Sequence, residues 1–116
     1  MRHLKRGRKF GRSENQRKAL LRNLAVALVD KHRITTTEAK AKELRHFFER
    51  AISDGKAKNV TALRKLRAKF PERSAAKIIN DLSKRFASRD GGYTRIIRVG
   101  NRKSDGAEMA IVELVE

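Results

Sequence analysis

The sequence predicts an α+β domain, in which several helices pack on a small sheet, preceded by a flexible basic N-terminal arm. Between residues 13 and 86, apolar side chains recur at the three- and four-residue spacing of amphipathic helices. After residue 90 the pattern changes to two short runs rich in β-branched residues. Residues 1–12 carry too few apolar side chains to offset the entropy of ordering them in water. We therefore expect residues 1–12 to be mobile until bound and residues 13–116 to form a single domain.

The first helix is predicted to begin at Ser13. The sequence SENQ is a capping box, in which the Ser13 hydroxyl accepts from the backbone N–H of Gln16 and the Gln16 amide reaches back. The apolar face of this helix consists of Leu20, Leu21, Leu24, Ala25 and Leu28. Around His32 the period changes, and the β-branched sequence RITTT predicts a short strand near residues 33–36.

The second helix is predicted over residues 38–52, with Thr36 or Thr37 as its N-terminal cap. Its apolar stripe consists of Ala41, Leu44, Phe48, Ala51 and Ile52. The sequence SDGK follows and indicates the end of the helix, with Gly55 in the left-handed conformation that closes many helices.

Two further helices are predicted before residue 90. Asn59 opens a short one with apolar positions at Val60, Leu63, Leu66 and Phe70. Pro71 stops it, because the residue before a proline is pushed out of helical geometry. The last helix covers residues 74–86 and carries Ile78, Ile79, Leu82 and Phe86 on one side. Together the two helices form a broken helical hairpin.

The C-terminal residues predict an antiparallel β-hairpin. Its strands are residues 93–99 (YTRIIRV) and 108–115 (EMAIVELV), and the charged loop of residues 100–107 forms a long tip. A hairpin alone is marginally stable, so we expect the strand near residues 33–36 to join it. The helices then cover one face of this sheet.

The charge of the chain points to a polyanionic partner. The 116 residues include 30 Lys and Arg against 13 Asp and Glu, a formal net charge of +17. Such a charge repels itself and destabilises a compact domain unless a partner neutralises it. There is no cysteine, which excludes disulfides, thiolate metal sites and a cysteine nucleophile.

The sequence gives little indication of a targeting peptide or a membrane-spanning segment. The best apolar stretch, ALLRNLAVALV, is interrupted by Arg22 and Asn23 and is shorter than the roughly 20 residues that span a bilayer. It also lacks the small-residue cleavage site of a secretory signal. A mitochondrial presequence stays open for the N-terminus, yet the residues after Asn23 still hold 21 Lys and Arg against 12 acids. Without tryptophan, and with the apolar stripes needed as core, we expect no membrane partner.

Catalytic chemistry is not indicated. His3, His32 and His46 show no metal-ligand spacing, and most carboxylates stand beside basic residues, as Glu43 does beside Arg45. The sequence GRKFG lacks the ending of a nucleotide-binding loop. We therefore predict no enzyme, no cofactor, no metal and no small-molecule substrate.

The basic residues form two groups that predict nucleic-acid binding. The first follows the arm and the first helix, where cations release counterions from a phosphate backbone; it consists of Arg2, Lys5, Arg6, Arg8, Lys9, Arg12, Arg17, Lys18 and Arg22. Within the arm, His3 is placed to meet a phosphate or a base. Phe10 stacks either on a base or on the protein's own helix.

The second basic group lies at the hairpin and consists of Arg89, Tyr93, Arg95, Arg98, Arg102 and Lys103. Gly91 and Gly92 either form a turn into the strand or let the backbone approach a phosphate closely. No helix-turn-helix, zinc finger or RNP aromatic pair is present, so readout of base sequence by these modules is not supported.

Several motifs resemble the family of bacterial large-subunit ribosomal proteins numbered seventeen. They are MRHLKRGRKFGR at the start, ITTTEAKAKELR in the middle, and RFASRDGGYTRI and DGAEMAIVELVE at the end. The resemblance implies a non-catalytic component of the cytoplasmic ribosome that contacts 23S ribosomal RNA and neighbouring large-subunit proteins. It implies RNA contacts at Arg2, His3, Lys5, Gly7, Arg8, Lys9, Arg12, Lys40, Lys42, Arg45, Arg89, Gly91, Gly92, Tyr93, Thr94 and Arg95.

Two other functions would also account for the positive charge, but the sequence supports neither. A nucleoid-type architectural protein that binds DNA usually needs a symmetric dimer or an element that enters a groove, and the sequence shows neither. An RNA-processing enzyme lacks its acid and base residues here. The structural ribosomal role is therefore our hypothesis.

Overall fold

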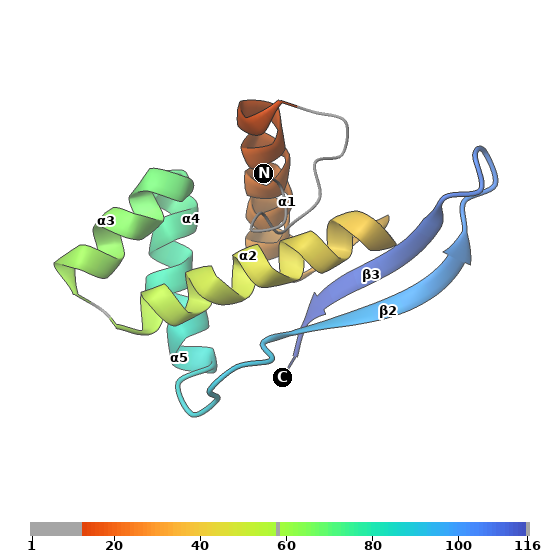
Figure 1. Ribbon diagram of the computed structural model, residues 1–116. Coiled ribbons are helices and arrows are strands. Elements are labelled where there is room, and N and C mark those ends of the chain that lie inside the picture. The colour runs from red at the N-terminus through yellow and green to blue at the C-terminus, as the bar shows by residue number, and fades with distance from the viewer. Residues whose placement is uncertain (1–12, 58, 116) are drawn as a thin grey trace, which may run out of the picture.

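The computed structural model describes residues 13–57 and 59–115 (Figure 1). The predicted mobile arm, residues 1–12, lies outside this range. The helices are α1 (Glu14–Lys31), α2 (Glu38–Lys56), α3 (Val60–Lys69), α4 (Glu72–Lys77) and α5 (Ser83–Arg85), and a π-helical turn, η1 (Ile78–Leu82), joins the last two. The strands are β1 (Arg33–Thr37), β2 (Thr94–Asn101) and β3 (Glu108–Leu114). The predicted α+β class is confirmed.

The sheet has three antiparallel strands in the order β1-β3-β2. The C-terminal strand therefore lies in the centre, and its residues Ala110, Val112 and Leu114 are buried on the face that the helices cover. β1 and the predicted hairpin pair as expected, although β2 runs two residues further than predicted and has an irregularity between Arg98 and Gly100. The long hairpin projects from the body of the molecule (Figure 1).

Helix α2 is the central element. Thr37 caps it by accepting from the backbone N–H of Lys40 at 3.4 Å, as predicted for one of the two threonines. The whole predicted stripe, from Ala41 to Ile52, is buried. With it α2 contacts α1, α3, α5, η1 and all three strands.

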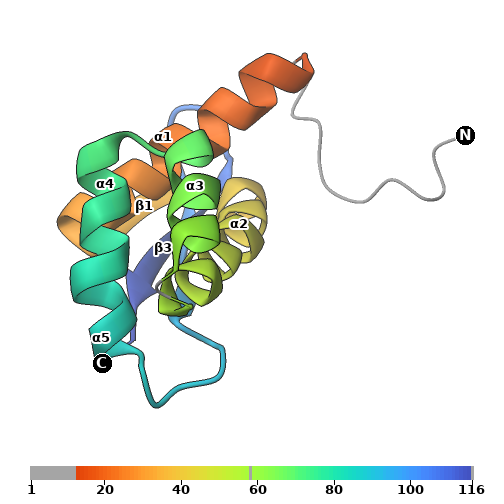
Figure 2. The same cartoon turned by 90° about the vertical axis from the view of Figure 1, so that its left-hand side faces the viewer.

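Helix α1 has the predicted capping box, with Ser13 and Gln16 joined by two hydrogen bonds of 3.3 Å. Only its C-terminal half enters the core, through Ala25, Leu28 and Val29. Leu20 and Leu21, predicted on the apolar face, are half-buried, because the first turns of α1 extend beyond the rest of the helical layer (Figure 2).

Helices α3 and α4 pack against each other across Pro71, as predicted for the helical hairpin. Asn59 caps α3 by accepting from the backbone N–H of Ala62 at 2.8 Å. Ala62, Leu66 and Phe70 are buried, whereas Val60, predicted on the apolar side, is 64% exposed. Val60 is the first residue of the helix, and no element of the described chain covers it at this end.

The second helix ends within SDGK as predicted, but the prediction that Gly55 is its left-handed end is wrong. Helix α2 continues to Lys56, and Gly55 is buried inside its last turn. A Cβ at this position would lie 2.8 Å from Ser83 Oγ and 3.0 Å from Ile78 Cγ2. Ser83 cannot swing away freely, because its hydroxyl donates to the Ile78 carbonyl at 2.7 Å inside η1. The glycine therefore permits close packing between α2 and the π turn.

Replacing Gly55 by alanine should destabilise the domain by about 1–3 kcal/mol, since overpacking against Ser83 and Ile78 exceeds the helix-propensity gain of about 1 kcal/mol. Chemical denaturation measures the change. The exposed Ser53→Ala variant of the same helix is the control and should stay within about 0.5 kcal/mol of the original. A Gly55→Ala protein as stable as the original would show that the contact with η1 is not tight.

Candidate nucleic-acid interface

The predicted contact residues are spread over several parts of the chain. Those of the arm, Arg2, His3, Lys5, Arg6, Gly7, Arg8, Lys9, Phe10 and Arg12, lie outside the described residues. Arg17, Lys18 and Arg22 lie on the protruding half of α1. The others lie on α2, at the entry to β2 or along the hairpin.

The structure brings Lys42 of α2 and Arg98 of β2, both predicted, together around one carboxylate. Glu38, whose side chain is only 12% exposed, lies 3.2 Å from Lys42 Nζ and 3.1 Å from Arg98 Nη2. The hydrogen bond from Lys42 is the main cause that lowers the pKa of Glu38, followed by the Glu108 side chain, and the charge of Arg98 adds to it. A cleft of about 420 Å³ opens here between α2 and β2, with Arg45 and His46 also in its wall.

A second carboxylate, Glu49, makes contacts between α2 and β2. Glu49 Oε2 accepts from Arg45 Nε at 3.3 Å and from the Thr94 hydroxyl at 3.2 Å. The motif of residues 40–45 and the start of β2 are therefore adjacent in space although about 50 residues separate them in the chain. Lys40, two residues before Lys42, is half-buried on the same helix.

The entry to β2 is held by Tyr93, whose side chain is only 1% exposed. Its ring packs against Phe86 with centroids 5.1 Å apart, and its hydroxyl accepts from Lys56 Nζ at 3.2 Å. Lys56 also donates to the Arg89 carbonyl. The side chains of Tyr93 and Thr94 thus face the interior and position the exposed Arg89 and Gly91.

Gly92, next to this tyrosine, has a φ of +63°. Glycine adopts this left-handed conformation without strain, which supports the turn predicted here. Its carbonyl accepts from Arg89 Nη1 at 3.4 Å. Arg89 is thereby oriented beside the turn while its guanidinium stays accessible.

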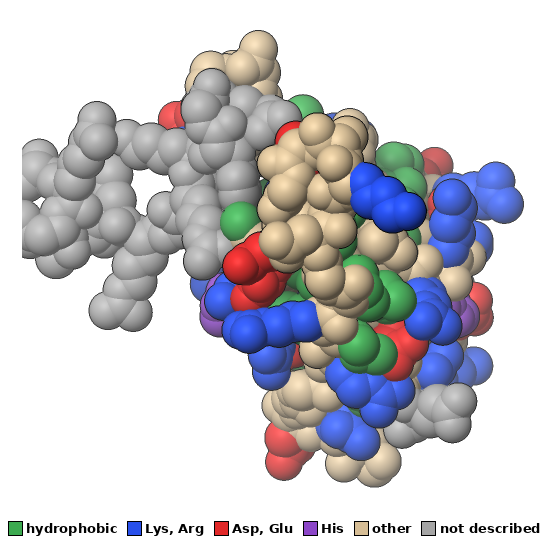
Figure 3. All heavy atoms as spheres, turned by 90° about the vertical axis from the view of Figure 1, so that its right-hand side faces the viewer, with side chains coloured by type: hydrophobic (Ala, Val, Ile, Leu, Met, Phe, Trp, Pro, Cys, Tyr) green, Lys and Arg blue, Asp and Glu red, His purple; other side chains and the backbone are tan. Residues whose placement is uncertain are grey.

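Cations of the hairpin are paired with carboxylates. On the face of the sheet away from the helices, Glu113 lies 2.7 Å from Arg95 and 3.7 Å from Arg33. At the tip, Arg102 donates two hydrogen bonds to Asp105, at 3.0 and 2.6 Å. Lys103 is exposed beside them. Figure 3 views this side of the molecule and shows Lys and Arg side chains around hydrophobic ones, with acidic side chains between them.

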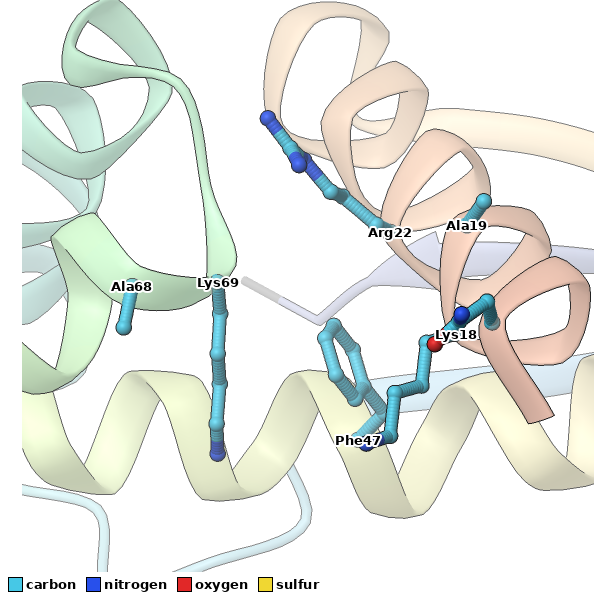
Figure 4. A pocket seen from close by; sticks show the side chains of 7 residues that line it. Lys18, Ala19, Arg22, Phe47, Ala68 and Lys69 are labelled. Atoms are coloured by element: carbon cyan, nitrogen blue, oxygen red, sulfur yellow. The ribbon is translucent and has the colours of Figure 1, made fainter.

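The sequence reasoning missed one part of the surface. A groove of about 450 Å³ lies between α1, α2 and α3. It is lined by Asn15 and by the six residues labelled in Figure 4, which are Lys18, Ala19, Arg22, Phe47, Ala68 and Lys69. Lys18 and Arg22 were predicted, but Phe47 and Lys69 were not. The run RKLRAK in α3, four cations without an acid, was the available signal for its basic side.

Residues 13–57 and 59–115 show neither a cluster of metal ligands nor a membrane-spanning helix. No three His, Asp or Glu side chains gather there in a way that could hold a metal ion. None of the helices in this range combines the length and apolar character that crossing a membrane requires.

Comparison with known proteins identifies the family. A sequence profile described as ribosomal protein L17 matches residues 20–115. The chain belongs to the ribosomal protein L17 family. The large ribosomal subunit protein bL17 of Gemmatimonas aurantiaca is 49% identical over 116 residues, which cover 99% of this chain and 98% of that protein. The bL17 of Fusobacterium nucleatum is 50% identical over 117 residues, covering 99% and 100%. The predicted resemblance is confirmed.

The Arg102–Asp105 pair at the hairpin tip predicts a pH dependence. Arg102 donates to Asp105, and the Ala107 N–H donates at 3.1 Å, which lowers the pKa of Asp105 to about 2. Because this pKa lies below the ordinary value of about 4, the pair favours the folded tip above about pH 4 and this contribution is lost as the pH falls through 2. Carboxyl NMR titration should give a midpoint of about 2 for Asp105.

In the same titration, Arg102→Gln should raise the Asp105 midpoint, although not fully, since the Ala107 N–H still donates. Lys103→Gln removes an adjacent charge that makes no ion pair with Asp105 and is the matched control. A normal midpoint in the unmodified protein would contradict the tip geometry.

Proposed function

We propose that this protein is a structural constituent of the large ribosomal subunit that binds and stabilises 23S ribosomal RNA through its basic arm and basic surface, without catalysing a reaction. Membership of the ribosomal protein L17 family carries the proposal, since the relatives that match nearly the whole chain are named large ribosomal subunit proteins. Neighbouring large-subunit proteins are its second class of partner. It acts in the cytoplasm as part of the ribosome.

The arrangement of charge supports RNA as the polyanion. The net charge of +17 favours a partner that releases counterions when its phosphates are neutralised. Several cations of the folded part already have carboxylate partners, Lys42, Arg45, Arg95, Arg98 and Arg102 among them. The cations of these pairs are 46–77% exposed and therefore accessible to phosphate, whereas the carboxylates of Glu38, Glu49 and Glu113 are only 12–24% exposed.

Other predicted cations have no carboxylate within ion-pair distance in the described part of the chain. They are Arg17, Arg22, Lys40, Arg89 and Lys103. Together with the cations of residues 1–12, they supply the charge that RNA binding requires. The folded domain positions these groups, and the contacts to phosphate fix its orientation on the RNA.

The first test of the ribosomal role is sedimentation of a cell lysate on sucrose gradients at low and high salt. The protein should travel with large ribosomal subunits at low salt and leave them only at high salt, because phosphate contacts weaken as salt rises. Migration with free DNA would support the nucleoid-type alternative. A position at the top of the gradient in low salt would contradict the proposal.

Deleting residues 1–12 should weaken binding to ribosomal RNA and flatten the dependence of log K on log salt, since six cations are removed. The thermal unfolding temperature of the truncated domain should change little, because the described core lies between Ala25 and Leu114. Filter binding and calorimetry give the two readouts. A large fall in the unfolding temperature would assign the arm to the core instead.

Arg17→Gln combined with Lys40→Gln tests the predicted surface of the folded domain. The slope of log K against log salt should fall by roughly 1.5, from about 0.7–0.9 for each phosphate contact. The matched control, Arg50→Gln with Lys84→Gln, removes the same charge from exposed positions outside the predicted set. An equal loss of slope in both double variants would show that total charge, and not this surface, determines binding.

A further inference from the structure

The groove between α1, α2 and α3 combines an aromatic ring with several cations. Phe47 rises from α2 into the space between α1 and the end of α3, with Lys69 on one side and Lys18 and Arg22 on the other (Figure 4). Ala19 and Ala68 form the apolar walls. With about 450 Å³, the groove is large enough for a small planar group and its substituents.

The groove places three cations around an apolar surface. Arg22 and Lys69 have no carboxylate within ion-pair distance among residues 13–57 and 59–115, and no acidic side chain lines the groove. Lys18 pairs with Glu14 at 3.2 Å, but both side chains are about 70% exposed, so water screens the pair and an incoming anion can replace Glu14. The groove therefore favours a ligand with a negative charge.

The aromatic ring of Phe47 favours a ligand that is planar as well as negatively charged. Phe47 is half-buried and packs on Phe70 with centroids 5.7 Å apart, which fixes the ring on α2. Lys69 Nζ lies 5.8 Å from the centroid of the Phe47 ring, a cation–π arrangement. A fixed ring beside cations binds flat ligands that also carry charge, because the ring stacks and the cations take the anion.

We propose that this groove binds one unstacked nucleotide of RNA, with its base on the Phe47 ring and its phosphate held by Lys18, Arg22 and Lys69. On binding, Lys69 moves from the ring to the phosphate. The proposal rests on the proposed RNA-binding function and deepens it, since the groove continues the basic side of α1. A base in a duplex has no free face, so the ligand is single-stranded.

An acidic peptide is the other anion that the charges alone would accept. It would leave the ring and the apolar walls without a planar partner, whereas a nucleotide uses the ring, the walls and the cations together. The continuity with Arg17 on the same helix also favours RNA. We therefore assign the groove to RNA and keep the peptide as an outcome of the test.

The test uses the full chain and a single-stranded RNA hexamer that carries 2-aminopurine, whose fluorescence falls when the base stacks. The chain has no tryptophan to interfere with it. Phe47→Leu keeps the apolar contact with Phe70 but removes the ring, so affinity for the hexamer should fall about tenfold and the quenching should disappear. Phe47→Tyr is the matched control that keeps the ring, and its affinity should stay within about twofold of the original.

Two further measurements distinguish the contribution of base stacking to binding from that of the phosphate contacts. Lys69→Gln should reduce the salt slope for the hexamer by roughly 0.7, whereas Phe47→Leu should leave the slope unchanged because it removes no charge. Binding to an RNA duplex should be unaffected by Phe47→Leu. Thermal unfolding of each variant verifies that the fold is intact.

Three results would overturn the nucleotide site. They are an unchanged affinity of Phe47→Leu for the hexamer, an equal loss for hexamer and duplex, and a loss confined to a glutamate-rich peptide, which would assign the groove to protein. Failure of the proposed function looks different, because the unmodified protein would then bind neither ribosomal RNA nor the hexamer in a salt-dependent way.

Discussion

The packing of α2 on both of its sides is the constraint on which the rest of the fold depends. Its buried stripe faces the sheet and the other helices at once, so α1, α3, η1, α5 and the three strands are placed relative to one helix. Close packing requires that side chains on this stripe match their neighbours in volume. Gly55 shows how strict the match is, since it leaves just enough room for Ser83 and Ile78 of the π turn.

The central helix also determines where charge can accumulate. Because one side of α2 faces β2, the carboxylates Glu38 and Glu49 lie between cations or hydroxyls of both elements. These two carboxylates add polar contacts between α2 and β2, and their cations stay at the surface. A chain with a net charge of +17 can thus fold around a neutral core and still present an excess of positive charge.

The two halves of α1 have different tasks. The C-terminal half supplies Ala25, Leu28 and Val29 to the core, and His32, with a φ of 63°, ends the helix and leads directly into β1. The N-terminal half extends past the helical layer, where it forms one wall of the groove that holds Phe47. The family match over residues 20–115 includes Arg22, Phe47 and Lys69 of this groove, whereas Lys18 and Ala19 lie just before it.

The sequence by itself determined the α+β class, the caps at Ser13 and Asn59, the buried stripe of α2 and the family, because these depend on local spacing and on motifs. It left the cap of α2 open between Thr36 and Thr37, and the structure selects Thr37. The sequence also predicted the basic residues as a set. Only the tertiary structure decided which of them meet, that Tyr93 is interior, that Gly55 serves packing, and that Phe47 and Lys69 share a groove. The physical reason is that these properties depend on the distance between elements far apart in the chain, which no local pattern encodes.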